Sequence, residues 1–225
     1  EFRMPGSSLS VAGPNIVLNT AVAEEVRQFA DALEGTPSED MEKAVRKLLK
    51  KAISDHKRII FNGNGYTDEW VEEAKRRGLY NLKALPDAMP YFIAPKNVEL
   101  FTKHHIFTEG EIHARYDILL ENYSKAIHVE SKTMVEMLQK DLMPPLLAFT
   151  GDTAQAAAQK KAFAPSISTA SEEKLVAELS SLYDTLAAGV EKLAADTAQA
   201  EHISDPLEAA IYYCRTVLEQ MNTLR

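Results

Sequence analysis

The first residues of the chain place two opposite charges on one face of a strand. The run EFRM alternates polar and apolar side chains before a Pro-Gly turn, a pattern that predicts a half-buried strand with Glu1 and Arg3 on the same side. A carboxylate can ligate a hard divalent cation, and a guanidinium fork can hold a phosphate or a carboxylate. Most exposed charge pairs of this kind are solvated surface. The pattern alone therefore leaves both roles open.

A second group of candidate metal ligands lies between residues 104 and 113. Adjacent histidines on a helix point about 100° apart, so they cannot share one metal ion. The spacing of Thr108 and Glu111 predicts a capping box, which would occupy Glu111 locally. We therefore expect this cluster to fix a helix start and not to bind a metal. Its members are His104, His105, Glu109, Glu111 and His113.

Two further segments could be taken for binding motifs. FNGNGYTDEW carries two glycines near a helix start but lacks the glycine spacing and the Lys-Ser/Thr of a phosphate-binding loop, so it predicts a turn and a helix capped by Thr67. KAVRKLLKKAISDHKR is strongly basic. Its apolar residues form one stripe, which makes the lysines the outer face of an amphipathic helix. With a net charge of −8 and a pI near 5.3, the chain is not expected to bind nucleic acid.

The elements that position these groups are nearly all helical by pattern. We expect one helix from Pro14 to Leu33, stopped at Gly35, and a second from Ser38 to about Arg58. A third ends at Gly78, and three prolines make residues 84–97 a loop or a broken helical segment. A spine helix then runs from Thr108 to about Met143, where Pro144-Pro145 breaks it. Residues 163–171 look like a flexible linker.

The last part of the chain predicts a helical hairpin. Thr169 with Glu172 and Asp205 with Glu208 have capping-box spacing, and leucines recur at helical intervals after each. Two such helices cannot bury both faces alone, so they must dock on the spine helix or on another subunit. Four seam residues are expected to be buried in one of these ways: Leu179, Leu182, Ile211 and Leu218.

The opening run EFRMPGSSLSVAGPNIVLNTAVAEEV resembles the end of the catalytic barrel of glutamine synthetases, most closely the long type III class. That family has a strand of the form Glu-x-Arg-x-Pro followed by a Ser-rich turn and a helix start. The later stretches IIFNGNGYTDEWVEEAKRRGLYNL and LPDAMPYFIAPKNVELFTKHHIFTEGEIHARYDILLENYSKAIHVESKTMVEML resemble the type III C-terminal region. The resemblance covers residues 1 to about 160 most closely and the rest more loosely.

The resemblance implies a parent enzyme that joins ammonia to glutamate with ATP through a γ-glutamyl phosphate. It implies that Glu1 is a ligand of an active-site Mg²⁺ or Mn²⁺ and that Arg3 contacts the substrate or phosphate. It also implies a homo-oligomeric ring. Because the other family carboxylates are missing from the sequence, the chain looks like a cut piece, and we expect it to be inactive and to bind no metal or ATP by itself.

The expected fold class is mainly α, with a long spine helix, a C-terminal hairpin and a short strand remnant of an α/β barrel. The expected division is 1–36, the end of the catalytic domain; 37–162, the helical region; and 163–225, linker and hairpin. A single cysteine, Cys214, excludes an intrachain disulfide, and with no apolar run of membrane-spanning length or signal peptide a cytoplasmic location is expected. The alternative function is a non-enzymatic helical scaffold that binds other proteins.

Overall fold

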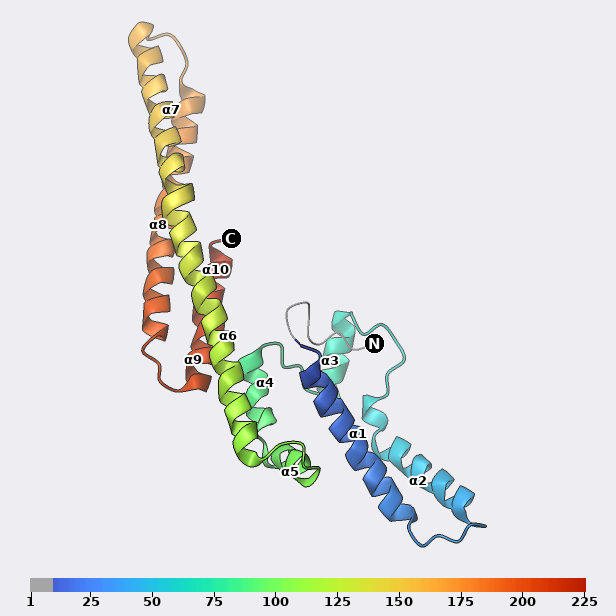
Figure 1. Cartoon of the computed structure of the whole chain (residues 1–225). Helices are drawn as coiled ribbons and strands as arrows, with labels where there is room; N and C mark the ends of the chain where they lie inside the picture. Colours follow the sequence, from blue (N-terminus) through green and yellow to red (C-terminus); the bar gives the residue numbers. More distant parts are fainter. Residues whose placement is uncertain (1–9) are drawn as a thin grey trace. The chain divides into compact units, whose positions relative to one another are not determined.

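The computed structural model describes residues 10–225, and Figure 1 gives the order of the elements. The predicted strand, with Glu1 and Arg3, lies outside the described residues. Within them the chain is helical and contains no strand, which confirms the mainly α fold class. Contacts divide the chain into two compact units. We call residues 10–83 with 88–114 unit 1, and residues 84–87 with 115–225 unit 2.

Unit 1 begins with α1 (Ala12–Leu33) and α2 (Met41–Asp55), followed by the 3₁₀ turn η1 (Lys57–Ile59) and α3 (Asp68–Arg76). α1 starts two residues before the predicted Pro14, and α2 starts three residues after the predicted Ser38. Thr67 precedes α3 as predicted but makes no side-chain capping bond. Gly35 and Gly78 have φ of 74° and 70°, the left-handed conformation that ends a helix. The two predicted stops are confirmed.

The proline-rich stretch forms two short helices, α4 (Leu85–Phe92) and α5 (Pro95–Lys103). This is the broken helical segment, not the loop, of the two predicted forms. Pro95 occupies the start of α5, where its missing N–H needs no partner. Phe101 is 3% exposed, and the centroid of its ring lies 6.1 Å from that of Phe92 and 5.6 Å from that of Phe107. This aromatic row holds α5 in unit 1.

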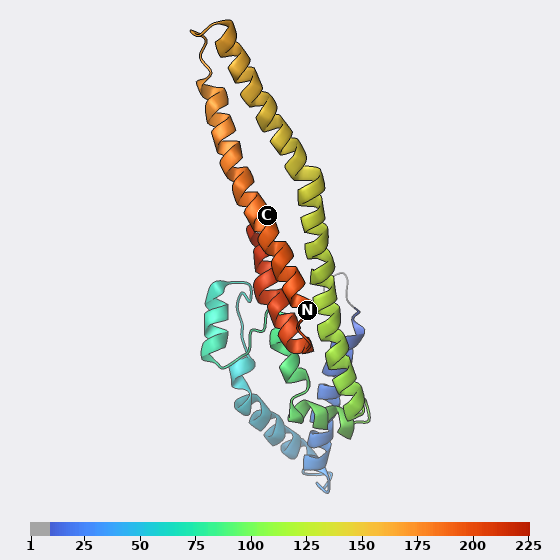
Figure 2. The ribbon, with the colours of Figure 1, turned by 90° about the vertical axis from the view of Figure 1, so that its left-hand side faces the viewer.

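The spine helix does not break at the two prolines. α6 (Glu109–Met137) passes through a π-helical turn, η2 (Leu138–Leu142), into α7 (Met143–Phe163), so the predicted break at Pro144 is wrong. Proline removes a donor and clashes with the carbonyl four residues earlier. The wider π turn just before the two prolines relieves that crowding, so the helix continues through them. Figure 2 shows α6 and α7 as one long rod.

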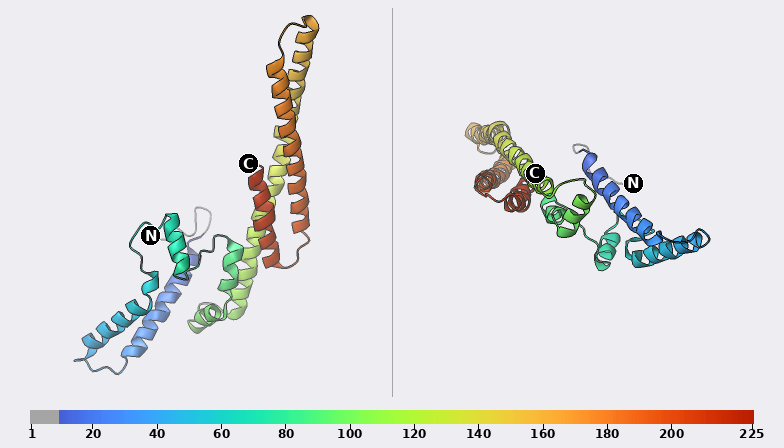
Figure 3. Two further views of the ribbon diagram at one scale, coloured as in Figure 1. Left: turned by 180° about the vertical axis from the view of Figure 1, so that it is seen from behind. Right: turned by 60° about the horizontal axis from the view of Figure 1, so that its bottom comes forward.

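α8 (Ala170–Ala200) returns antiparallel along this rod, so residues 164–169 are the only non-helical part of the predicted linker. α9 (Pro206–Tyr212), the π turn η3 (Tyr213–Val217) and α10 (Leu218–Thr223) then form a third layer, visible at the left of Figure 3. The hairpin does dock on the spine, as predicted. The core of unit 2 joins α6, α8 and the third layer through Ile127, Leu193, Ala200, Tyr213, Val217 and Met221.

Within residues 10–225, no third layer covers the upper part of the α7–α8 hairpin. Gln220, in the middle of α10, donates a 3.3 Å hydrogen bond to the carbonyl of Gly189. Leu182 lies two turns further along α8 and is 63% exposed. Ile211 is 41% exposed, whereas Leu179 and Leu218 are half-buried. Leu182 and Ile211 are therefore not buried within this chain, and their predicted burial between subunits stays a prediction.

One of the two hairpin caps differs from its prediction. Asp205 accepts a 2.8 Å hydrogen bond from the N–H of Glu208, as expected of an N-cap. Thr169 instead donates through its hydroxyl to Glu173 at 2.7 Å, and Glu172 pairs with Lys160 of α7. The lysines of α7 draw both acids into contacts across the hairpin. The predicted box between Thr169 and Glu172 is therefore wrong.

Candidate functional site

The described residues with the densest charge contacts gather around Glu24 in unit 1. Arg27 reaches its carboxylate at 2.8 Å from the next turn of α1, and Lys103 of α5 reaches it at 2.9 Å. The Nε2 atom of His104 lies 2.7 Å from the other carboxylate oxygen. We call these four residues the Glu24 cluster. The bond to Arg27, followed by those to Lys103 and His104, holds the pKa of Glu24 far below its usual value.

The Glu24 cluster joins α1 to α5, and both carboxylate oxygens of Glu24 already have partners. Three cationic or protonatable partners surround one carboxylate, so Glu24 stays ionised and its oxygens are occupied. A groove of about 470 Å³ lies beside it, and its lining mixes apolar residues of α1 with Asn15, Asn19, Thr20 and His104. Because the oxygens of Glu24 are occupied by its three partners, the cluster positions α1 against α5.

The histidine and acid group singled out in the sequence is not brought together. Glu111 accepts hydrogen bonds from the backbone N–H and hydroxyl of Thr108 at 2.7 and 2.9 Å, and its own N–H lies 3.3 Å from that hydroxyl, which confirms the capping box. His104 turns instead to Glu24, 80 residues earlier. Among residues 10–225, no three His, Cys, Asp or Glu side chains are placed to hold a metal ion.

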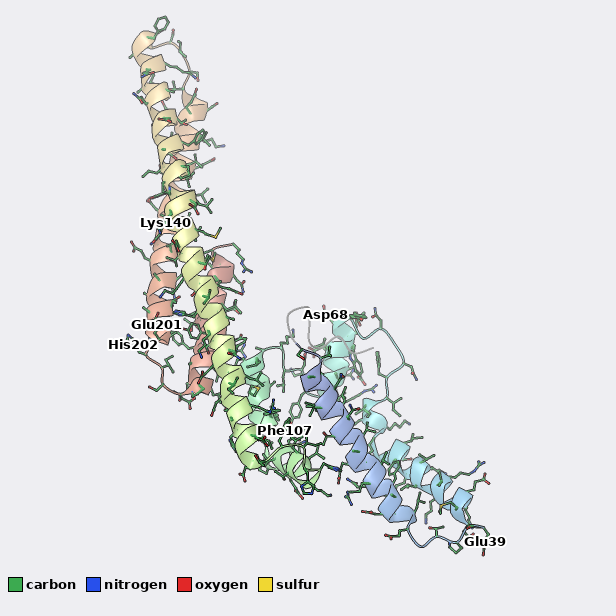
Figure 4. All side chains as sticks on the ribbon, in the orientation of Figure 1. Glu39, Asp68, Phe107, Lys140, Glu201 and His202 are labelled. Atoms are coloured by element: carbon green, nitrogen blue, oxygen red, sulfur yellow. The ribbon has the colours of Figure 1, made fainter. Side chains whose placement is uncertain are left out.

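A second polar group links α6, the end of α8 and the third layer of unit 2. The hydroxyl of Tyr213 lies 3.0 Å from Nδ1 of His128 on α6. The other ring nitrogen of His128 and the amine of Lys132 each lie 3.6 Å from Glu201, which is labelled in Figure 4. Burial, with a smaller contribution from the charge of Glu201, raises the pKa of Tyr213. Tyr213 therefore keeps its proton and acts as a fixed hydrogen-bonding group.

The π turn η3 makes two more contacts next to Tyr213. Arg215 holds both carboxylate oxygens of Asp87 at 2.7 and 2.9 Å. Tyr123 of α6 has a raised pKa, mainly because it is buried and also because it is hydrogen-bonded to Cys214. Three successive residues of one π turn thus contact three different partners. No local pattern in the sequence predicts these pairs, since the partners are far apart in the chain.

The exposed apolar residues of the α7–α8 hairpin form the other candidate surface. We call Leu147, Phe149, Phe163 and Leu182 the hairpin surface; their exposed fractions are 56, 55, 88 and 63%. Figure 2 shows this hairpin extending well beyond the end of α10. Only Ala157 is buried along α7. Because successive residues of a helix are turned by about 100°, Leu147 and Phe149 point to nearly opposite sides of α7, so the hairpin surface consists of separate exposed side chains and not of one patch.

The family model and the relatives that match this chain point to the same family. The sequence model of the glutamine synthetase C-terminal domain matches residues 44–161. The chain is 44% identical over 229 residues to a glutamine synthetase of Butyrivibrio fibrisolvens and 31% identical over 230 residues to a type-3 glutamine synthetase of Dictyostelium discoideum. It is 26% identical over 231 residues to a glutamine synthetase of Bacteroides fragilis strain YCH46. Each match covers the whole chain but only 32, 31 and 32% of the relative, so the chain spans about a third of their length.

A helix that crosses a bilayer must be both long and apolar. Within residues 10–225, none combines the length and the apolar content that crossing a bilayer demands.

Proposed function

Because this chain belongs to the glutamine synthetase family, and specifically to its C-terminal domain, we propose that it works as part of a longer ATP-dependent glutamate–ammonia ligase. The observation that carries this proposal is the 44% identity over the full chain to the glutamine synthetase of Butyrivibrio fibrisolvens. In the proposed reaction, ATP phosphorylates the glutamate side chain, and ammonia then displaces the phosphate. The substrates of the longer protein would be glutamate, ammonia and ATP.

Within that reaction we assign roles to the two charged residues at the start of the sequence. Glu1 offers a carboxylate, the donor that Mg²⁺ and Mn²⁺ prefer, and Arg3 offers the planar fork that matches phosphate or carboxylate oxygens. The metal would supply charge stabilisation at the transferred phosphoryl group. Glu1 would hold its share of the metal, and Arg3 would orient the anionic substrate. Neither residue is among those that the structure describes.

The chain alone is proposed to be inactive. One carboxylate cannot complete the coordination of a hard divalent cation, which takes about six oxygen ligands. Within the helical region from residue 37 onward, Asp87 is held by Arg215, and His128 lies beside Tyr213 and Glu201. These contacts between helices support a structural role for that region.

That structural role is proposed to be assembly of a homo-oligomer, such as a ring. The support is the hairpin surface, which leaves four large apolar side chains exposed on a projecting hairpin. We also propose a cytoplasmic location, because the single cysteine, Cys214, is a free and buried thiol, as is usual in a reducing compartment.

The proposal is tested with two proteins assayed in parallel. One is the 225-residue chain, and the other is the same chain joined to the unmatched part of the Butyrivibrio fibrisolvens relative. We expect the joined protein to form glutamine from glutamate and ammonia only when ATP and Mg²⁺ are present, and Glu1→Ala to abolish this. Arg3→Lys is expected to raise KM for glutamate more than it lowers kcat. Glutamine formation by the chain alone would contradict the proposed inactivity, and a fully active E1A variant would contradict the assigned metal ligand.

A further inference from the structure

The third layer of unit 2 covers only part of the hairpin on which it lies. Gln220 of α10 bonds to the carbonyl of Gly189 on α8, and α10 ends at Thr223. On α8, Leu182 and Leu175 lie seven and fourteen residues before Gly189, which places them on the same side of that helix. They are 63 and 37% exposed. The side of α8 that α10 contacts therefore continues beyond α10 as an exposed apolar stripe.

The α6–α7 rod carries a matching stripe on the same side. Leu142 lines a groove together with Met221 of α10, so its side of the rod faces the third layer. Phe149, Ala156 and Phe163 follow Leu142 at seven-residue intervals and therefore share its side to within about 60°. None of the residues on either stripe is charged. We call the two stripes together the open face, which consists of Leu142, Phe149, Ala156, Phe163, Leu175 and Leu182.

The two ends of the open face differ in shape. At the end nearest α10 lies the groove, with a volume of about 560 Å³ and walls that include Met134, Met137 and Met221. Methionine side chains are flexible and adapt to an inserted group. At the other end, Phe163 is 88% exposed. It lies 21 residues beyond Leu142, which is about 32 Å along the rod. One end is thus a hollow with apolar walls, and the other is a projecting aromatic ring.

A surface with a hollow at one end and a projecting ring at the other can pair with a second copy of itself. A two-fold axis through the middle of the open face would bring Phe163 of each copy to the groove of the other. Residues near such an axis meet their own copies, so like charges there would repel. Residues 143–159 include only one charged residue, Asp152. The middle of the rod's stripe therefore brings little repulsion to such a contact.

The size of the open face also fits a pair of copies. Two helices, each about 10 Å wide and about 32 Å long, present a face on the order of 600 Å². A stable interface buries roughly 800 Å² on each partner. The open face with its groove is therefore close to the area that a stable dimer needs.

We infer that a second copy of this chain covers the open face, with the two hairpins antiparallel and Phe163 of each copy seated in the groove of the other. This inference rests on the proposed assembly role and names the surface and the partner for it. A helix of a different protein would fill the groove but would leave Phe163 exposed. The antiparallel pair accounts for both ends of the face with one contact.

The first test compares two sides of the same helix. Phe149 and Leu147 are 55 and 56% exposed, but they point to nearly opposite sides of α7. By sedimentation equilibrium, the 225-residue chain should form a dimer whose population rises with concentration. Phe149→Asp and Leu182→Asp should each raise the dimer dissociation constant by at least about 30-fold, because a charge would enter an apolar contact. Leu147→Asp, the matched control, should change it by less than about threefold.

The second test measures the direction of pairing. The native cysteine, Cys214, is 7% exposed and gives a low background. Chains with Phe163→Cys are mixed with chains carrying Met137→Cys and treated with a short bismaleimide. The mixture should give a cross-linked pair, whereas Phe163→Cys chains alone should not, because their tips lie at opposite ends of the dimer. Linking of Phe163→Cys to itself would show parallel pairing and overturn the inference.

The remaining outcomes also decide the matter. A monomeric chain at all concentrations, or a dimer that Phe149→Asp and Leu182→Asp leave unchanged, would overturn the inference. Protection of Phe149→Cys from maleimide only in the joined protein, without the Phe163–Met137 cross-link, would show that the rest of the longer protein covers the open face, which also overturns it. Glutamine formation by a joined protein that gives no cross-link would leave the ligase proposal standing. The cross-link without glutamine formation would support the inference and contradict the ligase proposal.

Discussion

Leu193 and Leu182 allow a sharp test of where unit 2 is stabilised. They lie on the same helix, α8, but Leu193 is fully buried in the core and Leu182 is 63% exposed. Changing Leu193 to Ala removes three buried carbon groups, worth about 0.8 kcal/mol each, and leaves a cavity, so we expect a loss of about 3–4 kcal/mol. Because Leu182 is mostly exposed, Leu182→Ala should lose only about a third of that transfer energy. The higher helix propensity of Ala offsets about 0.2 kcal/mol of this loss. Its cost should stay below about 1 kcal/mol.

Urea unfolding followed by far-UV circular dichroism measures this difference. With a slope of about 1–3 kcal/mol per molar urea, Leu193→Ala should lower the midpoint by about 1–4 M, and Leu182→Ala by less than about 1 M. Trp70 is the only tryptophan and lies in unit 1, so its fluorescence serves as a control that should not change. Equal losses for the two variants at low protein concentration would refute the reasoning. A loss for Leu182→Ala that grows with concentration would instead show the hairpin surface buried between copies.

Three further outcomes are expected. The pKa of Glu24 is lowered in the folded protein, so the stability that Glu24 contributes is present above its unfolded pKa of about 4.3 and is lost as the pH falls toward its folded pKa. Glu24→Gln should therefore flatten the acid dependence of hydrogen exchange in α1 below about pH 5. An unchanged exchange profile would count against the Glu24 cluster. Thr108→Ala removes the hydroxyl that caps Glu111 N–H, keeps the backbone N–H bond to the Glu111 carboxylate, and should cost about 1 kcal/mol. Thr133→Ala, a mid-helix change at an exposed position, should cost less than about 0.5 kcal/mol, and equal effects in thermal melts would contradict this. Tyr213→Phe removes the hydroxyl bonded to His128 and should cost about 0.5–1.5 kcal/mol at pH 8, measured by urea unfolding, and a neutral result would show that this bond does not stabilise unit 2.

Local signals in the sequence were sufficient for the helix ends. Gly35 and Gly78 stop their helices because a positive φ suits glycine, and Thr108 opens α6 because Glu111 is three residues away. These features need only neighbouring residues. The amphipathic pattern likewise predicted that the last helices dock on the spine or on another subunit, since an apolar seam must be covered, and the structure shows the first of these.

The sequence did not reveal features that depend on distant residues or on the length of a neighbour. The bond between Glu24 and His104 joins positions 80 apart, so no local pattern contains it. The seam of α8 runs evenly through Leu182 and Leu193, yet among the described residues only Leu193 packs against the third layer. A pair of prolines predicts a break, but a break and a π turn have the same local sequence signal. Glu1 and Arg3 remain predictions from resemblance.

The π turn at Leu138–Leu142 is the place where the α6–α7 rod holds an extra residue. It accommodates about one residue more per turn than the α-helices on either side, so the extra residue is absorbed within one turn and α6 continues into α7. A one-codon deletion there would return this turn to ordinary α-helical geometry. The crowding around Pro144 and Pro145 that the wider turn relieves would then return. Lys140, labelled in Figure 4, marks the place on the rod where such a change would act.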